Sequence, residues 1–246
     1  MCGRYLIISP PEAMRLLAEY LEQPNFPPRY NVAPTQAIPV VRHDSGARHF
    51  ALMRWGLLPS WVKDPKTFTL LINARGETAA EKPAFKNAMK RRRCLIPADG
   101  FYEWKVEGKL KRPFVVRPKD RKPVMFAGLW ETWTGPNGEE IDTAAIVTAD
   151  ANQTLHPIHH RMPVILERDE FEPWLDCAHV DAKEASMLLK PARDERMEAW
   201  EISPQINRVV NDDPAVLEPY TAPDIVDEAP KAKRKRAVDE RQASLF

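Results

Sequence analysis

The chain is short of cysteine and of glycine. Its 246 residues include 3 cysteines, Cys2, Cys94 and Cys177, and no two of them form a C-x-x-C pair. An odd number of widely spaced cysteines argues against a disulfide framework and against a cysteine-rich zinc site. The 9 glycines are outnumbered by 24 prolines, which predicts rigid turns and irregular connections rather than long helices.

Long apolar runs and net charge are also missing. No stretch approaches the roughly 20 apolar residues of a membrane-spanning helix, and we expect no signal peptide. The 36 basic and 35 acidic residues nearly cancel, which argues against a general polyanion binder but allows a local basic groove. The histidines lack metal-ligand spacing and there is no phosphate-binding glycine loop, so we expect neither a metal nor a cofactor. These features predict a soluble, cytoplasmic protein in a reducing compartment.

Short β-prone runs that do not alternate regularly with helices predict an α+β fold. A first helix is expected from Ser9, which would act as N-cap with Glu12 completing a capping box. Further helices are expected at 82–92, 170–176 and 181–189, and strands at 38–41, 50–55, 94–96, 114–117, 124–130, 143–148 and 164–166. This pattern favours one domain over 2–220, built on a curved, mostly antiparallel sheet or open barrel with flanking short helices. The polar, charge-blocked stretch 221–246 is typical of a disordered tail.

Cys2 directly follows the initiator methionine in the opening MCGRY. Removal of Met1 would leave an α-amine and a thiol on adjacent carbons, and this pair can close on an aldehyde to give a thiazolidine ring. Ordinary pKa values near 7.7–8.0 for the amine and about 8.5 for the thiol predict that both nucleophiles are partly available at neutral pH. The same cysteine could instead serve an N-terminal nucleophile hydrolase, or its position could be without function.

Five stretches of the chain, in order, carry a resemblance to a known family. They are MCGRY (1–5), RYNVAPTQ (29–36), LINARGETAAEKPAFK (71–86), IPADGFYEWK (96–105) and IHHRMPVIL (158–166). Together they resemble the SOS response-associated peptidase (SRAP) family, of bacterial type, over roughly residues 2 to 210. The resemblance implies a sensor of abasic sites in single-stranded DNA. The N-terminal cysteine of such a sensor forms a thiazolidine crosslink with the ring-opened sugar, and some lyase activity could accompany it.

The resemblance also implies a catalytic role for four residues. Cys2 matches the nucleophile, and Asn73 matches the residue that holds the N-terminal amine. Glu103 matches a proton shuttle near the Schiff base, a role that requires burial to raise its pKa. His159 matches the histidine that assists opening of the sugar ring. The family often has aspartate where this chain has His160, and motif position favours His159.

Taken singly, these residues have plainer interpretations. Asn73 lies in a turn-like NARG sequence, Glu103 could be a surface glutamate, and His159 could be a structural histidine. Only the combination favours a reactive site. The resemblance therefore also leaves open a cysteine autopeptidase, as the family's name implies, or a module that binds single-stranded DNA without a covalent link.

A DNA surface is expected around this combination. Arg4, Arg75 and Arg161 are close in sequence to Cys2, Asn73 and His159, and we predict that they contact phosphates. Trp61 is expected to stack on a base, a contact that tolerates any sequence.

A denser basic run follows Lys86, with Lys90 and residues 91–93. For this run, DNA contact and a solvated helix face are equally good interpretations.

The chain ends in QASLF. Gln242, Leu245 and Phe246 resemble the short peptide by which bacterial replication and repair proteins dock on the sliding clamp. The basic run at 231–236 could add nonspecific DNA affinity or act as a spacer. These features predict a monomer that associates with the nucleoid and the replication fork.

Overall fold

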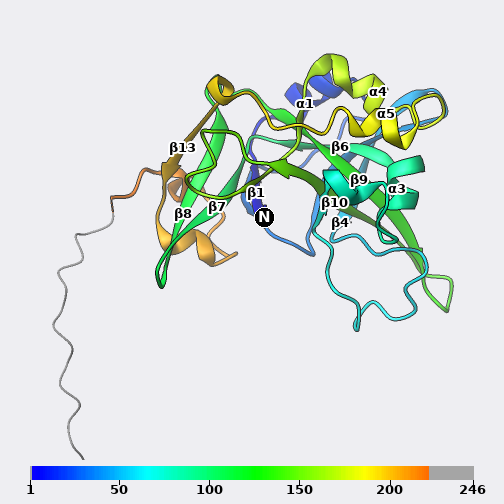
Figure 1. Ribbon diagram of the computed structural model, residues 1–246, viewed down its shortest axis with the longest axis horizontal. Helices are drawn as coiled ribbons and strands as arrows, with labels where there is room; N and C mark the ends of the chain where they lie inside the picture. Colours follow the sequence, from blue (N-terminus) through cyan, green and yellow to red (C-terminus); the bar gives the residue numbers. More distant parts are fainter. Residues whose placement is uncertain (1, 222–246) are drawn as a thin grey trace, which may run out of the picture.

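The structure is a computed structural model that describes residues 2–221 (Figure 1). The predicted tail residues Gln242, Leu245 and Phe246 lie outside the described residues. Strands dominate, and each helix is short. The strands are β1 Arg4–Ile7, β2 Arg29–Val32, β3 Ala37–Asp44, β4 Ala47–Trp55, β5 Asn73–Arg75, β6 Arg93–Ala98, β7 Gly100–Glu107, β8 Leu110–Pro118, β9 Val124–Thr134, β10 Glu140–Asp150, β11 Arg161–Pro163, β12 Ile165–Leu166 and β13 Met197–Glu201. The α-helices are α1 Pro11–Ala18, α2 Gly76–Ala79, α3 Lys86–Arg91, α4 Phe171–Leu175 and α5 Ala182–Ser186, and the 3-10 helices are η1 Arg168–Glu170, η2 Asp194–Arg196, η3 Pro204–Asn207 and η4 Pro214–Leu217.

Five strands close into a barrel. β3 pairs with β4 and β6, β9 pairs with β6 and β10, and β10 returns to β4. All of these pairings are antiparallel except β4–β10, so the predicted α+β class with a curved, mostly antiparallel sheet is confirmed. The barrel is closed rather than open, and closure leaves these five strands without an unpaired edge between them. The interior is filled by side chains such as Trp55, Phe126 and Ile146, which are fully buried.

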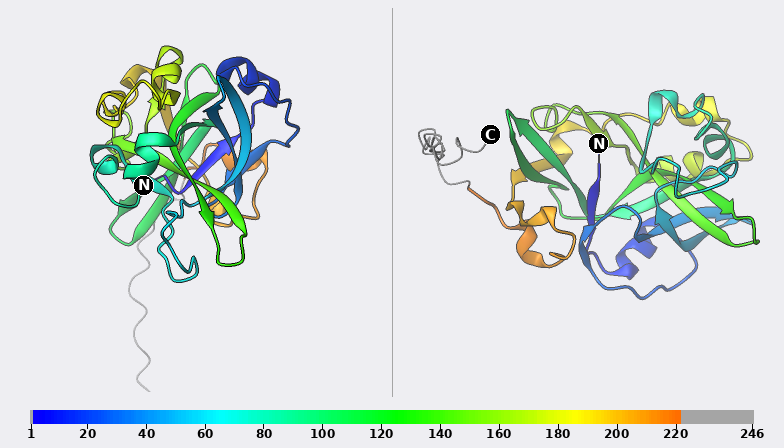
Figure 2. Two further views of the ribbon diagram at one scale, coloured as in Figure 1. Left: turned by 90° about the vertical axis from the view of Figure 1, so that its right-hand side faces the viewer. Right: turned by 90° about the horizontal axis from the view of Figure 1, so that it is seen from below.

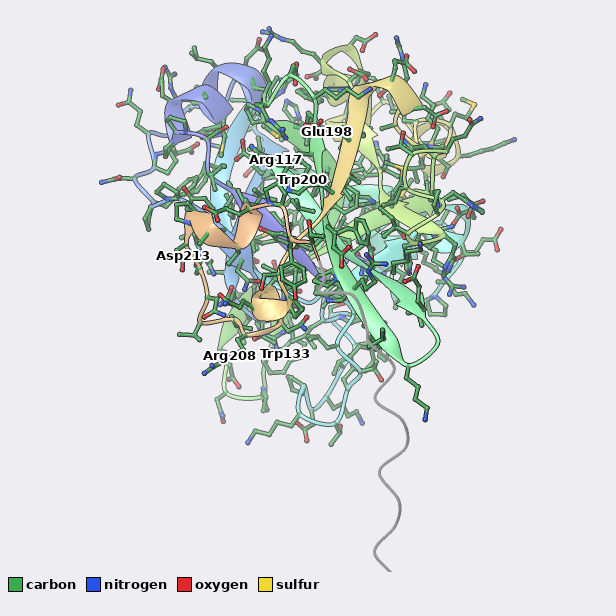
Figure 3. All side chains as sticks on the ribbon, turned by 90° about the vertical axis from the view of Figure 1, so that its left-hand side faces the viewer. Arg117, Trp133, Glu198, Trp200, Arg208 and Asp213 are labelled. Atoms are coloured by element: carbon green, nitrogen blue, oxygen red, sulfur yellow. The ribbon has the colours of Figure 1, made fainter. Side chains whose placement is uncertain are left out.

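A second sheet of five strands has the order β13-β8-β7-β1-β2. Figures 1 and 2 show the N-terminal end of β1 in the middle of the molecule, between the β7–β8 hairpin and the barrel. In Figure 3, the segment that follows β13 lies over the outer face of this sheet, with Arg208 and Asp213 on its two turns. Ile206 and Val216 of that segment pack into a small core with Leu6, Tyr102 and others. The sheet therefore brings the first and last described segments of the chain together.

The sequence pair Asp99–Gly100 holds β1 against β7. The buried Asp99 carboxylate accepts hydrogen bonds from the backbone N–H of Ile8 at 2.6 Å and of Ser9 at 2.8 Å. Gly100 has a φ of +156°, and a Cβ there would lie 2.5 Å from the carbonyl oxygen of Val116. Only glycine tolerates both the conformation and the close approach, so this position fixes the start of the strand that carries Glu103.

The predicted start of the first helix is wrong. The N-cap of α1 is Pro10, and no side chain caps it. Ser9 is bound to Asp99 instead, and Glu12 forms an ion pair with Arg15. Ser9 binds the buried Asp99 rather than capping the helix because a buried carboxylate must be hydrogen-bonded, and its donors come from Ile8 and Ser9.

Candidate active site

Cys2 is brought beside Glu103 by the pairing of β1 with β7. Arg4 lies opposite Tyr102 in this antiparallel pair, so the chain before Arg4 runs alongside the strand residues that follow Tyr102. Cys2 is fully buried, and its Sγ donates a weak hydrogen bond to the Arg4 carbonyl at 3.6 Å. The nucleophile and the acid predicted from distant parts of the sequence therefore occupy the same site.

Asn73 reaches the same site from β5. β5 pairs in parallel with β10, with Asn73 opposite Ile146. The Asn73 side-chain Nδ2 donates to the carbonyl oxygen of Cys2 at 2.9 Å. Its Oδ1 is buried and has no hydrogen-bond partner among residues 2–221. The observed contact is thus with the Cys2 carbonyl, and the role predicted for Asn73 in holding the α-amine stays a prediction.

Glu103 is a buried carboxyl, with 2% of its surface exposed. Burial raises its pKa to about 7, because an ionised carboxylate loses solvation away from water. A group with this pKa can both donate and accept a proton near neutral pH. The expectation that burial raises the pKa of Glu103 is confirmed.

His159 lies on the loop between β10 and β11, and its Nδ1 is 3.8 Å from Oε1 of Glu103. The backbone N–H of Arg161 donates to Nδ1 at 3.0 Å. The carbonyl oxygen of Arg161 lies 3.1 Å from the same nitrogen, so the two backbone groups of Arg161 orient the ring without fixing which nitrogen carries the proton. Burial lowers the pKa of His159, which favours the neutral ring. His160 stacks on the outer side of His159, with ring centroids 4.5 Å apart, and is exposed.

The pKa of the Cys2 thiol differs from the value expected from the sequence. Burial, and then the negative charge of Glu103, raise its pKa well above the ordinary value. The thiol is therefore protonated at neutral pH rather than partly ionised, and it needs a base before it can attack. Glu103 is the nearby group with a suitable pKa.

An open pocket of about 400 Å³ gives access to Glu103 and His159. Its lining includes Glu103, His159 and Trp104, with Lys111 from the β7–β8 hairpin and Asn207 from η3. Trp104 donates its indole N–H to Oδ1 of Asn207 at 2.9 Å. The pocket therefore combines two proton-transfer groups, an aromatic face and a cation.

The three arginines expected to contact phosphates are in different environments. Arg75 is exposed on β5, two residues after Asn73, and its side chain makes no ion pair or hydrogen bond within residues 2–221. Arg161 is buried and bound to Glu77 and Asp150, each at 2.7 Å. Arg4 also has partners, described below. Arg75 is the one of the three whose guanidinium is unengaged in the described part of the chain.

The predicted aromatic and basic contacts lie outside the pocket. Trp61 is 55% exposed on the loop between β4 and β5, and it packs edge-on against Phe68 with centroids 5.5 Å apart. Lys86 is exposed at the start of α3. In the basic run, Arg93 is buried and donates to four backbone carbonyls, among them that of Trp174 at 2.5 Å. That arginine therefore holds α4 and the following loop in place and is not part of a DNA surface.

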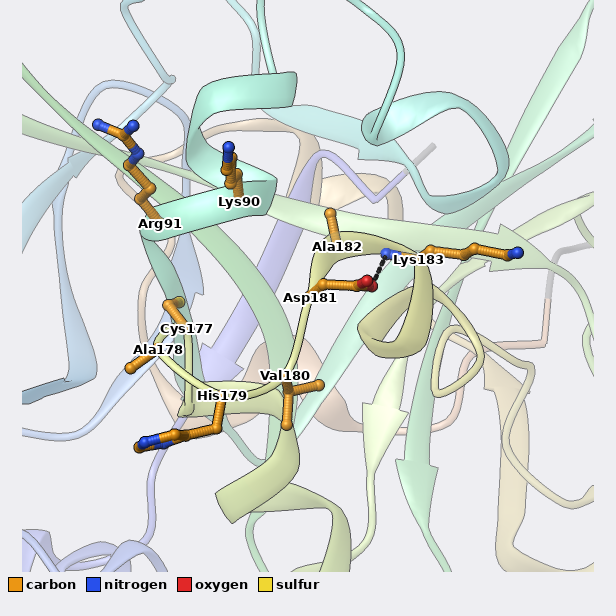
Figure 4. Close-up of a pocket in the computed structure, with 9 residues that line it drawn as sticks. All are labelled: Lys90, Arg91, Cys177, Ala178, His179, Val180, Asp181, Ala182 and Lys183. Atoms are coloured by element: carbon orange, nitrogen blue, oxygen red, sulfur yellow. Dashed lines mark hydrogen bonds between the residues drawn. The ribbon is translucent and has the colours of Figure 1, made fainter.

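A second hollow, of about 490 Å³, lies on another part of the molecule (Figure 4). Cys177 and His179 line it, together with Lys90 and Arg91 of α3 and Lys183 of α5. In Figure 4, Arg91 and Lys183 point away from each other and leave no convergent set of groups. Cys177 follows the end of α4, and Cys94 is buried in the core.

Among residues 2–221 there is no group of three or more histidine, cysteine or acidic side chains that could hold a metal ion. Within the same residues no helix combines the length and the apolar character needed to cross a membrane.

Sequence reasoning missed the role of Asn31, which is fully buried. Its Oδ1 accepts a hydrogen bond from Arg4 at 2.8 Å, and its Nδ2 lies within 3.1 Å of the carbonyls of Ile206 and Arg208. The available signal was its place in RYNVAPTQ, an asparagine in the middle of a β-prone run. An amide there is unfavourable unless a buried network needs it.

Known proteins resemble this chain over most of its length. The family model for SOS response associated peptidase (SRAP) matches residues 1–209. The abasic site processing protein YoqW of Bacillus subtilis is 37% identical over 89% of this chain and 100% of its own length. The abasic site processing protein HMCES of Gallus gallus is 36% identical over 85% of this chain and 71% of its own length. A crystal structure of a protein from Bacteroides thetaiotaomicron superposes with a TM-score of 0.78 at 29% identity, covering 89% of this chain and 100% of that one. The chain belongs to the SOS response-associated peptidase family.

Proposed function

We propose that this protein processes abasic sites in single-stranded DNA by forming a covalent thiazolidine with Cys2 after removal of Met1. The observation that supports this most strongly is the combination of a buried Cys2 with Glu103, whose pKa of about 7 suits two opposite proton transfers. Relatives that are 36–37% identical carry the name abasic site processing protein, which agrees with a DNA lesion as the substrate.

The reaction would begin at the α-amine rather than at the thiol. The amine adds to the C1′ aldehyde of the ring-opened sugar and gives a carbinolamine. The protonated Glu103 donates its proton to the departing hydroxyl, water leaves, and an iminium forms. Sγ of Cys2 then bonds to C1′ while its proton passes to the Glu103 carboxylate. One water is released overall, and Glu103 ends in the state in which it began.

This order explains why a thiol with a raised pKa is compatible with the reaction. Once Glu103 has protonated the leaving hydroxyl it is a carboxylate, so a base for the thiol proton is present at the moment when the iminium carbon can accept the sulfur. The unpartnered Oδ1 of Asn73 supports a further role, because a released α-amine is the kind of donor that this oxygen lacks. Abstraction of a C2′ proton from the iminium would instead give strand cleavage, which is the basis of the lyase activity.

His159 would act before these steps. Abasic sugar is mainly a closed hemiacetal, and the ring oxygen must gain a proton for the aldehyde to appear. His159 lies in the pocket beside Glu103, and its imidazolium form would give a proton to that oxygen while the C1′ hydroxyl loses one. His160 is exposed beside it, and this difference favours His159 over His160.

For the DNA backbone, the exposed Arg75 is the strongest candidate among the predicted phosphate contacts, and the exposed Trp61 could stack on a base. Arg161 and Arg4 already have protein partners, so a phosphate would have to compete for them. We further propose that the monomer is tethered to the sliding clamp through Gln242, Leu245 and Phe246.

The test is incubation of the purified protein with single-stranded DNA that carries one abasic site. We expect a denaturation-resistant adduct that the Cys2→Ala variant does not form. Intact mass should report loss of Met1 and release of one water on adduct formation. An adduct that persists in Cys2→Ala would refute the thiazolidine, and unchanged reaction by protein that keeps Met1 would refute the role of the amine.

The same mass spectrum separates the alternatives. An autopeptidase acting on this chain would still show Met1 removal but no DNA adduct. A noncovalent module would shift the mobility of DNA under native conditions only.

A further inference from the structure

The segment after β13 forms part of the wall of the active-site pocket. Arg4 donates from Nη1 to the carbonyl of Ile206 at 3.0 Å and from Nη2 to the carbonyl of Asn207 at 3.3 Å. Asn31 binds the carbonyls of Ile206, Arg208 and Asn211. Because Arg4 also donates to Asn31, the two side chains form one network. The network ties the turn at 206–211 to β1 and β2, the strands next to Cys2.

This network places Asn207 in the pocket with a defined amide orientation. The indole N–H of Trp104 is only a donor, so the atom 2.9 Å from it is the carbonyl oxygen Oδ1 of Asn207. The side-chain NH₂ group therefore points elsewhere, and it makes no hydrogen bond within residues 2–221. Asn207 lines the pocket together with Glu103, His159 and Lys111.

From this geometry we infer that Asn207 is a positioning residue that donates its side-chain N–H to a phosphate oxygen next to the abasic sugar. Lys111 adds positive charge to the same pocket, and the one acid in its lining, Glu103, is only partly ionised near neutral pH. These surroundings favour an anionic oxygen over a neutral hydroxyl as the acceptor. The inference rests on the proposed function, since it concerns how the lesion-bearing strand is held for Cys2.

The decisive variant is Asn207→Asp. A carboxylate keeps an oxygen for the indole of Trp104, so the pocket wall is retained, but the donor is lost. The probe is single-stranded DNA carrying a tetrahydrofuran abasic analogue, which cannot react, and fluorescence anisotropy at constant salt gives its Kd. We expect binding roughly 10- to 100-fold weaker than for wild type, the value of a hydrogen bond to a charged group.

Gln205→Glu is the matched control. It makes the same change of charge on the same turn, at an exposed side chain that does not line the pocket. Equal losses for the Asn207→Asp and Gln205→Glu variants would overturn the inference, because they would reflect general repulsion of DNA. Thermal melting of each variant reports whether the turn is still folded.

A second arm identifies the acceptor. Methylphosphonate at the phosphates flanking the tetrahydrofuran site should weaken binding of the wild type and should add little further loss in Asn207→Asp. Additive losses would show that Asn207 does not contact those phosphates. A wild type that forms no adduct with aldehyde-bearing DNA would refute the proposed function, whereas this binding assay, which needs no reaction, would still decide the role of Asn207.

Discussion

Replacing Glu103 with glutamine should stabilise the fold at alkaline pH while it removes the proposed chemistry. The carboxyl is 2% exposed and its pKa is raised from 4.5 to about 7 by burial. The folded state therefore keeps the proton up to about pH 7, whereas the unfolded chain loses it near pH 4.5. Ionisation of Glu103 therefore lowers the free energy of unfolding.

The sign and the window follow from these two pKa values. Between about pH 4.5 and 7 the native state binds more protons than the unfolded state, so the contribution of Glu103 to stability falls as pH rises. Below this window the contribution is constant, and above it the full cost applies. At about 1.4 kcal/mol for each factor of ten in the proton affinity, the cost is about 3 kcal/mol, a large share of a typical unfolding free energy of about 5–15 kcal/mol.

The measurement is urea unfolding of wild type and Glu103→Gln at several pH values from 4.5 to 8.5. We expect the variant to gain stability relative to wild type across the window, by up to about 3 kcal/mol at the alkaline end. Glu107→Gln, on the same strand but exposed and paired with Lys105 and Arg112, is the control and should show no such gain. A constant difference between wild type and Glu103→Gln over this range would refute the assignment of a raised pKa.

Three further outcomes are expected. Arg93→Met should lower the unfolding free energy by roughly 3 kcal/mol or more, because four backbone carbonyls, two of them in buried contacts, lose their donor, whereas the exposed Arg91→Met should change it by less than about 0.5 kcal/mol. Asn73→Ala should slow adduct formation with abasic DNA more than it weakens binding of tetrahydrofuran DNA, and equal effects on both would contradict a role at Cys2. Deletion of 242–246 should abolish pull-down by the sliding clamp and leave crosslinking intact, and a loss of crosslinking would contradict separate modules.

Sequence periodicity predicted the barrel strands better than the second sheet. β3, β4, β6, β9 and β10 are long or apolar runs, and each contains a run expected from its side-chain pattern. In the second sheet only β8 was predicted, as the run at 114–117. The strands β1, β2, β7 and β13 were not predicted, because their residues mix charged or polar and aromatic side chains. Closure of the barrel also could not be predicted, because it depends on the parallel β4–β10 pairing between segments far apart in sequence.

The four reactive-site residues were identified by family motif and not by local physics, since each alone has a plainer interpretation. The structure brings Cys2 into contact with Asn73, and Glu103 close to His159, through pairings that no local pattern encodes. The partners of Arg4 and Arg161 could not be predicted from the sequence for the same reason. An arginine near a nucleophile in sequence suggests a phosphate contact. The partners that its guanidinium actually binds are carboxylates and carbonyls from distant parts of the chain, which the sequence does not reveal.

The raised pKa of Cys2 has a consequence that can be tested without DNA. The thiolate is the species that reacts with alkylating agents and oxidants, and Cys2 is both fully buried and held protonated, whereas Cys177 is partly exposed. Iodoacetamide should therefore modify Cys177 well before Cys2 in the native protein, with the buried Cys94 as a second protected site, as peptide mass mapping can show. In urea this order should disappear.

An aldehyde does not depend on a thiolate that is already present. It reacts first with the α-amine, and the Glu103 carboxylate that results from loss of water then accepts the thiol proton. The same protein should therefore be inert to iodoacetamide at Cys2 and still form the adduct with abasic DNA. Alkylation of native Cys2 as fast as Cys177 would show that the thiolate is populated and that the proton cycle through Glu103 is unnecessary.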